Sequence, residues 1–190
     1  MKIALVLALL AGAASAAPPP KKPSRAPTAT AAPVRGGWRA AQWGMTSREV
    51  LAAFSGEASE DGDALAIPKL DVTGIEMKAA LEFRDGRLWR VVLSALDAPT
   101  MVQFDALAAE LTKKYGAAAA QESRPFDIFQ LAGITSTHES SSSSWVADDT
   151  AMELKYVWKS WKDRSKPSTD KETKTLELAY SDRAAVSPNL

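Results

Sequence analysis

The chain has 190 residues, with 23 basic and 23 acidic side chains, one His and no Cys. About 46% of the residues are hydrophobic and 24% are charged, which is typical of a globular domain and argues against a wholly disordered chain. The lack of Cys excludes a disulfide framework, a thiolate metal site and a cysteine nucleophile, and a single His excludes His-pair metal motifs. The balanced charge gives no electrostatic reason to expect nucleic acid as the main partner.

The first 16 residues have the pattern of a cleaved export signal. Lys2 precedes the apolar run Ile3–Leu10, and small residues follow as far as Ala14-Ser15-Ala16, which fits the small-x-small cleavage rule. The apolar stretch of about a dozen residues is shorter than the ~20 that a membrane-spanning helix needs. We therefore expect residues 1–16 to be a signal peptide, and the protein to be periplasmic or secreted by a bacterium.

Residues 17–36 are rich in Pro, Ala and Thr and contain no acidic or aromatic residue. Such a segment cannot bury enough apolar surface to offset the entropy of ordering it, so it is expected to be an extended, disordered tether. Its four basic residues stand before a body, residues 37–190, with 18 basic and 23 acidic side chains, a net charge of −5. The tether is either a solvated spacer or a basic arm that touches anionic envelope surfaces.

Two helices are predicted from capping boxes, in which a Thr and a residue three positions later close the free backbone donors of a helix start. Thr46 with Glu49 predicts a helix from about Ser47 to Ser55, ending at Gly56. Thr100 with Gln103 predicts a second helix that ends at Gly116. In both, the apolar residues recur at helical spacing and indicate a buried face.

Alternating apolar residues predict strands around these helices. Residues 75–83 and 89–95 are expected to form a hairpin with a three-residue loop, Arg84-Asp85-Gly86, which pairs Leu81 with Trp89. The last third is predicted as a three-stranded meander in which Trp145 lies opposite Met152. Residues 126–134 are left as a strand or a packed loop, and the run Ser140–Ser144 is expected to be a flexible surface loop.

These elements give the order (β)αββα(β)βββ. We therefore predict an α+β fold with an antiparallel sheet of about five or six strands and two helices packed on one face. The domain is expected to span residues 37–188, with 189–190 as a tail. Each half of the chain also has the order helix, Gly stop, loop and hairpin, which suggests an internal duplication.

A family resemblance is carried by Gly44-Met45-Thr46-x-x-Glu49-Val50 with Gly56, followed by Leu81-x-Phe83-x-x-Gly86-x-Leu88. This pattern, over roughly residues 44–93, resembles the BamE/SmpA type of outer-membrane assembly lipoprotein and the β-lactamase-inhibitor-protein-like fold. The resemblance implies a protein-binding envelope module with helices packed on an antiparallel sheet. The chain lacks the lipidated Cys of the assembly factors, and no functional residue is carried over.

Catalytic chemistry finds little support in the residues. His138 is followed by Glu139 and serines, but adjacent residues of one chain point apart and do not form a Ser-His-acid triad. Residues 60–63 gather three carboxylates without the spacing of an EF-hand, so a solvated acidic turn is expected there. No phosphate loop, nucleophile elbow or zinc motif occurs. The sequence predicts no catalytic residue, no cofactor, no metal site and no enzyme.

One segment, residues 156–166, interleaves aromatic with basic residues. The expected partner-binding residues are Trp158, Lys159, Trp161, Lys162 and Arg164. A structural interpretation competes with this one: Trp158 continues the buried alternation, Trp161 caps the sheet edge, and the lysines keep that edge soluble.

The expected function is an exported, non-catalytic envelope module that binds a protein through an open sheet face or the Trp161 loop. The alternative is a binder of cell-wall glycan or another small ligand through exposed aromatic side chains. The oligomeric state is not predicted.

Overall fold

A computed structural model describes residues 36–186 except Asp63 and Ala132, with the side chains of residues 125–127 also left out. The predicted signal peptide, nearly all of the tether and the tail lie outside the described residues. More than half of the described residues are in strands. In chain order the elements are β1 (Gly37–Trp38), β2 (Ala41–Gln42), α1 (Ser47–Phe54), β3 (Ser59–Asp61), β4 (Ala64–Val72), β5 (Ile75–Arg84), β6 (Arg87–Ala95), α2 (Met101–Tyr115), β7 (Ala120–Leu131), β8 (Ile134–Ala147), β9 (Thr150–Asp163), the 3₁₀ turn η1 (Pro167–Thr169), β10 (Lys171–Asp182) and α3 (Arg183–Val186).

Both predicted helix starts are confirmed. The Thr46 and Thr100 side chains accept hydrogen bonds from the N–H groups of Glu49 and Gln103, and the latter two side chains accept from the N–H groups of the two threonines. Helix α1 ends where Ser55 takes a left-handed conformation, and α2 ends at Gly116. Local chemistry therefore determines both helices.

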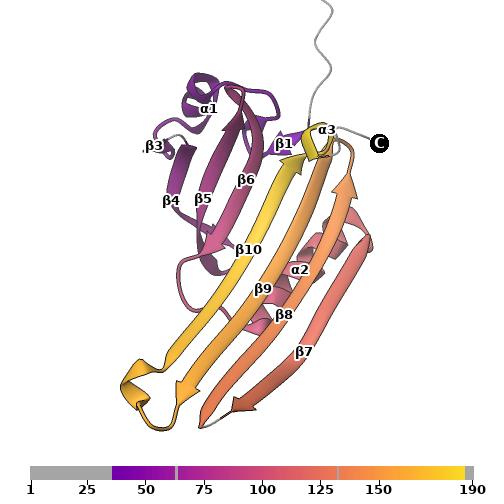
Figure 1. Ribbon diagram of the computed structural model, residues 1–190. Coiled ribbons are helices and arrows are strands. Elements are labelled where there is room, and N and C mark those ends of the chain that lie inside the picture. The colour runs from indigo at the N-terminus through magenta and orange to yellow at the C-terminus, as the bar shows by residue number, and fades with distance from the viewer. Residues whose placement is uncertain (1–35, 63, 132, 187–190) are drawn as a thin grey trace, which may run out of the picture. The chain divides into compact units, whose positions relative to one another are not determined.

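The main sheet has eight antiparallel strands in the order β3-β4-β5-β6-β10-β9-β8-β7, and β1 and β2 form a separate two-stranded sheet (Figure 1). The predicted α+β fold with five or six strands and two helices on one face is therefore wrong: residues 36–186, as far as they are described, are mostly sheet, with three short helices. Each half of the chain is a helix followed by four antiparallel strands. The two halves meet where the last strand of each, β6 and β10, pair antiparallel.

The core is one cluster that runs through both halves. It includes Val50 and Phe54 of α1, Leu107 and Leu111 of α2, and the inward residues of the central strands. The N-terminal segment is joined to the C-terminal half by a buried hydrogen bond of 2.9 Å from Trp43 Nε1 to Thr150 Oγ1. Because the two helices and the strands share this cluster, the halves are expected to be energetically coupled.

The predicted register of the β5–β6 hairpin is wrong. The turn has two residues, Asp85 and Gly86, both with positive φ, as in a type I′ turn. An irregularity between Leu88 and Arg90 then shifts the pairing, so that Leu81 lies opposite Val91 rather than Trp89. This bulge leaves both apolar sets on one face and turns Trp89 out of the alternation.

Several strands were not foreseen. Strands β3 and β4 occupy the predicted loop between α1 and β5, residues 120–131 form a full strand, and α3 follows β10. The run Ser140–Ser144, predicted as a flexible loop, lies inside β8. The pairing of Trp145 with Met152 across the turn Asp148-Asp149 is confirmed.

The strands at the two edges of the main sheet are interrupted or short. Strand β7 contains Pro125, and its pairing with β8 is irregular between Arg124 and Asp127. Strand β3 has three exposed residues. Among the described residues, no helix is long and apolar enough to cross a membrane.

Candidate functional site: an open face of the sheet

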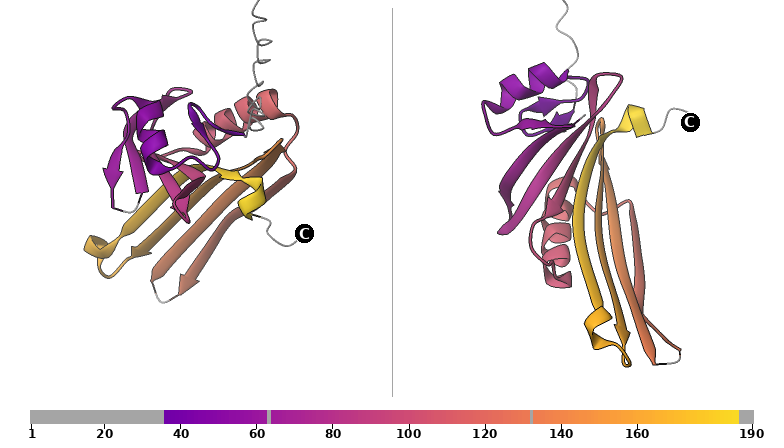
Figure 2. Two further views of the ribbon diagram at one scale, coloured as in Figure 1. Left: turned by 90° about the horizontal axis from the view of Figure 1, so that it is seen from above. Right: turned by 60° about the vertical axis from the view of Figure 1, so that its left-hand side comes forward.

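The strands β8, β9 and β10 have one buried face and one open face. Along β9, the even-numbered residues from Thr150 to Tyr156 are buried, whereas the odd-numbered residues from Ala151 to Lys159 are exposed or half-buried. Helix α2 packs against β8 and β9 on the buried side. Figure 2 shows α2 on one side of these strands, and no helix covers their other side over most of its length. That uncovered side is the open face.

The serine run of β8 serves both faces of the sheet. Ser141 and Ser143 are buried on the side of α2, where they lie near Phe104 and Ala108. Ser140 and Ser142 lie on the open face, opposite Val157 and Lys155. Serine side chains are small, so α2 can approach the sheet closely on one side. On the open face, the same small side chains leave a depression along β8.

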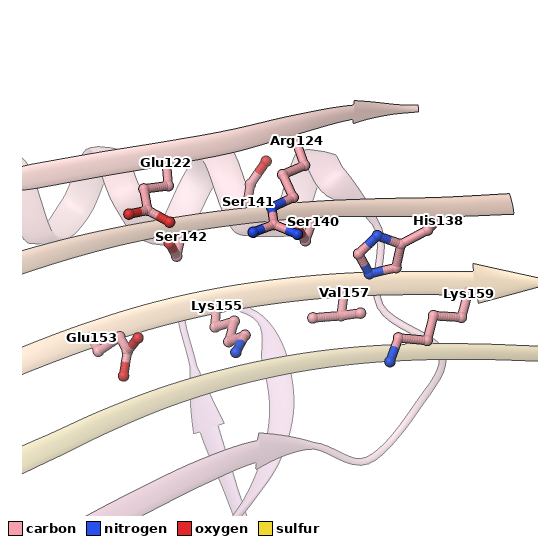
Figure 3. Close-up of a pocket in the computed structure, with 10 residues that line it drawn as sticks. All are labelled: Glu122, Arg124, His138, Ser140, Ser141, Ser142, Glu153, Lys155, Val157 and Lys159. Atoms are coloured by element: carbon pink, nitrogen blue, oxygen red, sulfur yellow. The ribbon is translucent and has the colours of Figure 1, made fainter. Parts of the chain in front are cut away.

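A hollow of about 350 Å³ lies over this low strip, and we call it the open-face groove. It is lined by Glu122 and Arg124 of β7, His138 and Ser140–Ser142 of β8, and Glu153, Lys155, Val157 and Lys159 of β9 (Figure 3). The strands β7 and β9 lie on either side of β8, about 10 Å apart, since neighbouring strands are about 4.8 Å apart. The groove therefore has a hydroxyl-bearing floor and charged walls, and its width suits one extended chain.

The charges of the groove are unevenly distributed along its length. Glu122 and Glu153 lie toward the end near the turn Asp148-Asp149, whereas Arg124 and Lys159 lie toward the other end. Lys155 faces Glu122 across the groove, because both are in register with Ser142. A ligand with its own charges in the complementary order would be oriented by this pattern.

The predicted partner-binding residues do not form one surface. Trp158 is on the buried side, because side chains alternate along β9 and Trp158 is two residues after the buried Tyr156; its register partners are Glu139 and Lys174. Trp161 is on the open face with Lys159. The Lys174 ammonium lies 5.4 Å from the centre of the Trp158 ring and pairs with Glu172 at 2.9 Å. The structural interpretation thus describes Trp158 well. The other two predicted residues, Lys162 and Arg164, are exposed on the α2 side of β9 and just beyond its end.

The turn after β9 is held by Asp163. Its carboxylate accepts hydrogen bonds from the backbone N–H and the hydroxyl of Ser165, at 2.8 and 2.6 Å. These bonds to the ionised form lower the pKa of the Asp163 carboxyl. The Asp170 carboxylate accepts from the Asp163 N–H at 3.0 Å, which closes the loop onto β10. The loop that carries Arg164 is therefore tied at its base.

His138 is half-buried in the open-face groove and shares it with Ser140 and Glu122. Among the described residues, no hydrogen bond or ion pair joins the imidazole to a serine or a carboxylate of the groove. A contact of about 2.6–3.2 Å is the usual structural mark of a nucleophile–base pair. In the same part of the chain, no three His, Asp or Glu residues are grouped to hold a metal ion.

Sequence reasoning missed the β7 side of this surface. Glu122 and Arg124 form one wall of the groove, and Phe129 and Leu131 are 61% and 63% exposed farther along the same strand. Phe129 lies in register with Ser136, which in turn lies opposite Trp161. The available sequence signal was an alternation of side chains that includes Glu122 and Arg124 and resumes after Pro125. This signal places those residues at the groove only when the register of β7 against β8 is known.

A second hollow, of about 440 Å³, lies near α3 at the opposite end of β9 and β10. Its lining is largely apolar and includes Trp89, Val146, Ala151 and Val186. The Arg84 guanidinium lies 4.1 Å from the centre of the Trp89 ring and donates a hydrogen bond to the Ala185 carbonyl. These contacts join the bulged residue of β6 to α3.

Comparisons with protein-family models, with curated proteins and with solved structures find no match to this chain. The resemblance to the outer-membrane assembly lipoproteins stays a prediction.

Proposed function

We propose that this protein is an exported, non-catalytic envelope module that binds a protein partner on the open face of its sheet. The observation that carries the proposal is the open-face groove itself, a hollow with a serine floor between charged walls. Charged groups at fixed positions beside a groove orient a partner that carries complementary charges and disfavour partners that do not. The export signal, as predicted from residues 1–16, is the basis for the envelope compartment.

The glycan alternative needs several exposed aromatic rings on one surface. Trp38, Trp43 and Trp145 are 7% exposed or less. The remaining tryptophans are half-buried in three different places: Trp89 beside α3, Trp158 on the buried side and Trp161 on the open face. One pair, Phe129 with Trp161, shares a row of the open face, and this pair would be the smallest platform for a sugar. The dispersed tryptophans favour the protein partner.

The test fills the groove. Ser142→Tyr places a ring on the groove floor at a strand position that tolerates aromatic residues. Ala109→Tyr adds the same ring at an exposed position of α2, on the other side of the sheet, and is the matched control. Each protein, beginning at Ala17, is immobilised and used to capture partners from envelope extract, and bound proteins are identified by mass spectrometry.

We expect one protein to be retained by the parent chain and by Ala109→Tyr, and to be lost with Ser142→Tyr. Equal retention by Ser142→Tyr would place the partner elsewhere and refute the groove as the site. If the folded parent retains no protein but binds cell-wall glycan, and Trp161→Ala abolishes this, the glycan alternative is correct.

A further inference from the structure

The two hairpins farthest from α1 and α3 form what we call the distal end, at the lower end of Figure 1. It consists of the tip of the β7–β8 hairpin, residues 128–131 with 133 and 134, and the β9–β10 hairpin, residues 159–174. The two tips are neighbours, because Ile134 of β8 is in register with both Leu131 of β7 and Asp163 of β9.

Large apolar side chains are exposed at the β7–β8 tip. Ile128, Phe129 and Leu131 are 50%, 61% and 63% exposed, and they account for three of the seven large hydrophobic side chains exposed among the described residues. Ile128 pairs with Thr137, a residue of the buried face, whereas Phe129 and Leu131 pair with residues of the open face. The tip therefore presents apolar groups on both of its sides.

The neighbouring hairpin is basic, although the body of the protein is acidic. Residues 159–174 hold six Lys and Arg against three Asp and Glu, a net charge of +3, while the rest of residues 37–190 has a net charge of −8. All three acids are engaged within the hairpin: Asp163 accepts hydrogen bonds from Ser165, Asp170 accepts one from the Asp163 N–H, and Glu172 pairs with Lys174. Positive charge is thus concentrated beside the apolar tip.

We propose that the distal end docks on the surface of a lipid bilayer that contains anionic phospholipid. Phe129 and Leu131 enter the outer part of the acyl region, Trp161 lies at the headgroup level, and the basic side chains of residues 159–171 contact lipid phosphates. Trp is suited to the interface because its ring is apolar and its N–H is polar. Lysines bury their stems while their ammonium groups stay at the headgroups, and each contributes attraction to an anionic surface.

A bilayer fits this end better than a protein surface does. A protein partner would cover one face of the hairpin, and the apolar groups on the other face would remain in water. Lipid surrounds an inserted tip on all sides, so Ile128 and Phe129 can both be buried although they point to opposite faces. This surface shares Lys159 with the open-face groove but is otherwise made of other residues, and the inference does not depend on the proposed function.

The test is co-flotation of the protein, beginning at Ala17, with vesicles. The probe vesicles are phosphatidylcholine with about one third phosphatidylserine, and pure phosphatidylcholine vesicles are the comparison. The tip variant is Phe129→Ser with Leu131→Ser, and the matched control is Val102→Ser, which removes an apolar side chain that is 76% exposed on α2. Because all three residues are exposed, the variants should fold, and a thermal melt of each checks this.

We expect the parent and Val102→Ser to float with the anionic vesicles, with at least tenfold weaker partition onto neutral vesicles or at high salt. The tip variant should lose roughly tenfold or more of its partition, as expected when two large exposed apolar side chains no longer enter an apolar phase. Replacing Lys162 and Lys171 with Gln should weaken binding to the anionic vesicles and leave the weak binding to neutral ones unchanged.

Insertion is tested by a second measurement. Lipids brominated in the acyl chain should quench part of the tryptophan fluorescence of the bound parent, and Trp161→Phe should remove that quenching.

The proposal is overturned if the folded parent does not bind anionic vesicles, or if the tip variant binds as the parent does. Binding that is lost only when Lys21 and Lys22 are replaced would also overturn it, because the N-terminal segment would then be the anchor. An acidic protein retained through the tip without any vesicle binding would assign the distal end to a protein partner instead.

Discussion

The two halves of the protein have the same order of elements and use it differently. In the N-terminal half, an eight-residue helix precedes strands of three to ten residues, whereas in the C-terminal half a fifteen-residue helix precedes strands of 12–14 residues. The core cluster takes in nearly all the inward side chains of β4, β5 and β6. The strands of the C-terminal half continue beyond their part of the core, and their extra length holds Trp161 and the exposed tip. The comparison suggests that the shorter half stabilises the fold and that the longer half offers surface.

The largest effect is expected at the seam between the halves. Leu178 of β10 is 1% exposed and lies in register with Leu93 of β6 and Leu154 of β9. Leu178→Ala should lower the free energy of unfolding by about 2–5 kcal/mol, because it leaves a cavity shared by both halves. Urea unfolding should remain a single transition by fluorescence and circular dichroism. Two separate transitions in the parent protein would show that the halves are independent domains.

A smaller effect is expected from the hydrogen bond between Trp43 and Thr150. Thr150→Val keeps the side-chain shape but leaves the buried indole N–H without its acceptor, so the free energy of unfolding should fall by about 1–3 kcal/mol. The double variant with Trp43→Phe should show coupling between the two positions in a mutant cycle. If the two losses are simply additive, this bond does not join the N-terminal segment to the C-terminal half.

The two helix caps allow the halves to be compared by one substitution. Thr46→Ala and Thr100→Ala each remove a cap of the same type, and each should cost about 1 kcal/mol of stability. Thermal melts measure both, and Ser47→Ala, one residue after the first cap, is the control. Equal losses would indicate one cooperative unit, and a loss confined to Thr100→Ala would mean that α1 contributes little to it.

The last expected effect is a pH dependence at the seam, which is absent at neutral pH. Burial raises the pKa of Tyr180, a residue of β10 paired with Val91 and Met152, from 10.0 to about 12. The folded state therefore favours the neutral phenol, and the associated stability is present below pH 10 and is lost as pH rises through 12. Urea unfolding at successively higher pH should show this loss, and Tyr180→Phe should remove that part of the pH dependence. The same slope in both proteins would contradict the assignment.

Sequence reasoning succeeded where a local signal determines structure. Both helices follow from their capping boxes, and the pairing of Trp145 with Met152 follows from alternation across the turn Asp148-Asp149. It failed in β8, because Ser140–Ser144 has no apolar alternation and serine has little preference for strands. That segment is a strand because β7 and β9 lie on either side of it, and no local property of five serines reveals its neighbours.

The candidate site was predictable only in part. An open sheet face was expected, and Lys159 and Trp161 lie on the side where the groove is found. Trp158 lies on the other side. Side chains alternate along a strand, so two tryptophans three positions apart necessarily point to opposite faces. The walls contributed by Glu122 and Arg124 depend on the pairing of β7 with β8, a non-local contact.

The interrupted edge of the sheet affects how copies of this protein behave at high concentration. A regular edge strand offers its free N–H and C=O groups to any other chain and so acts as a template for growing aggregates. In β7, Pro125 has no N–H to donate, and the pairing with β8 shifts register between Arg124 and Asp127. A second chain could therefore follow that edge for only a few residues before losing register. This break should limit edge-to-edge growth of the sheet even though the protein exposes apolar side chains at one end.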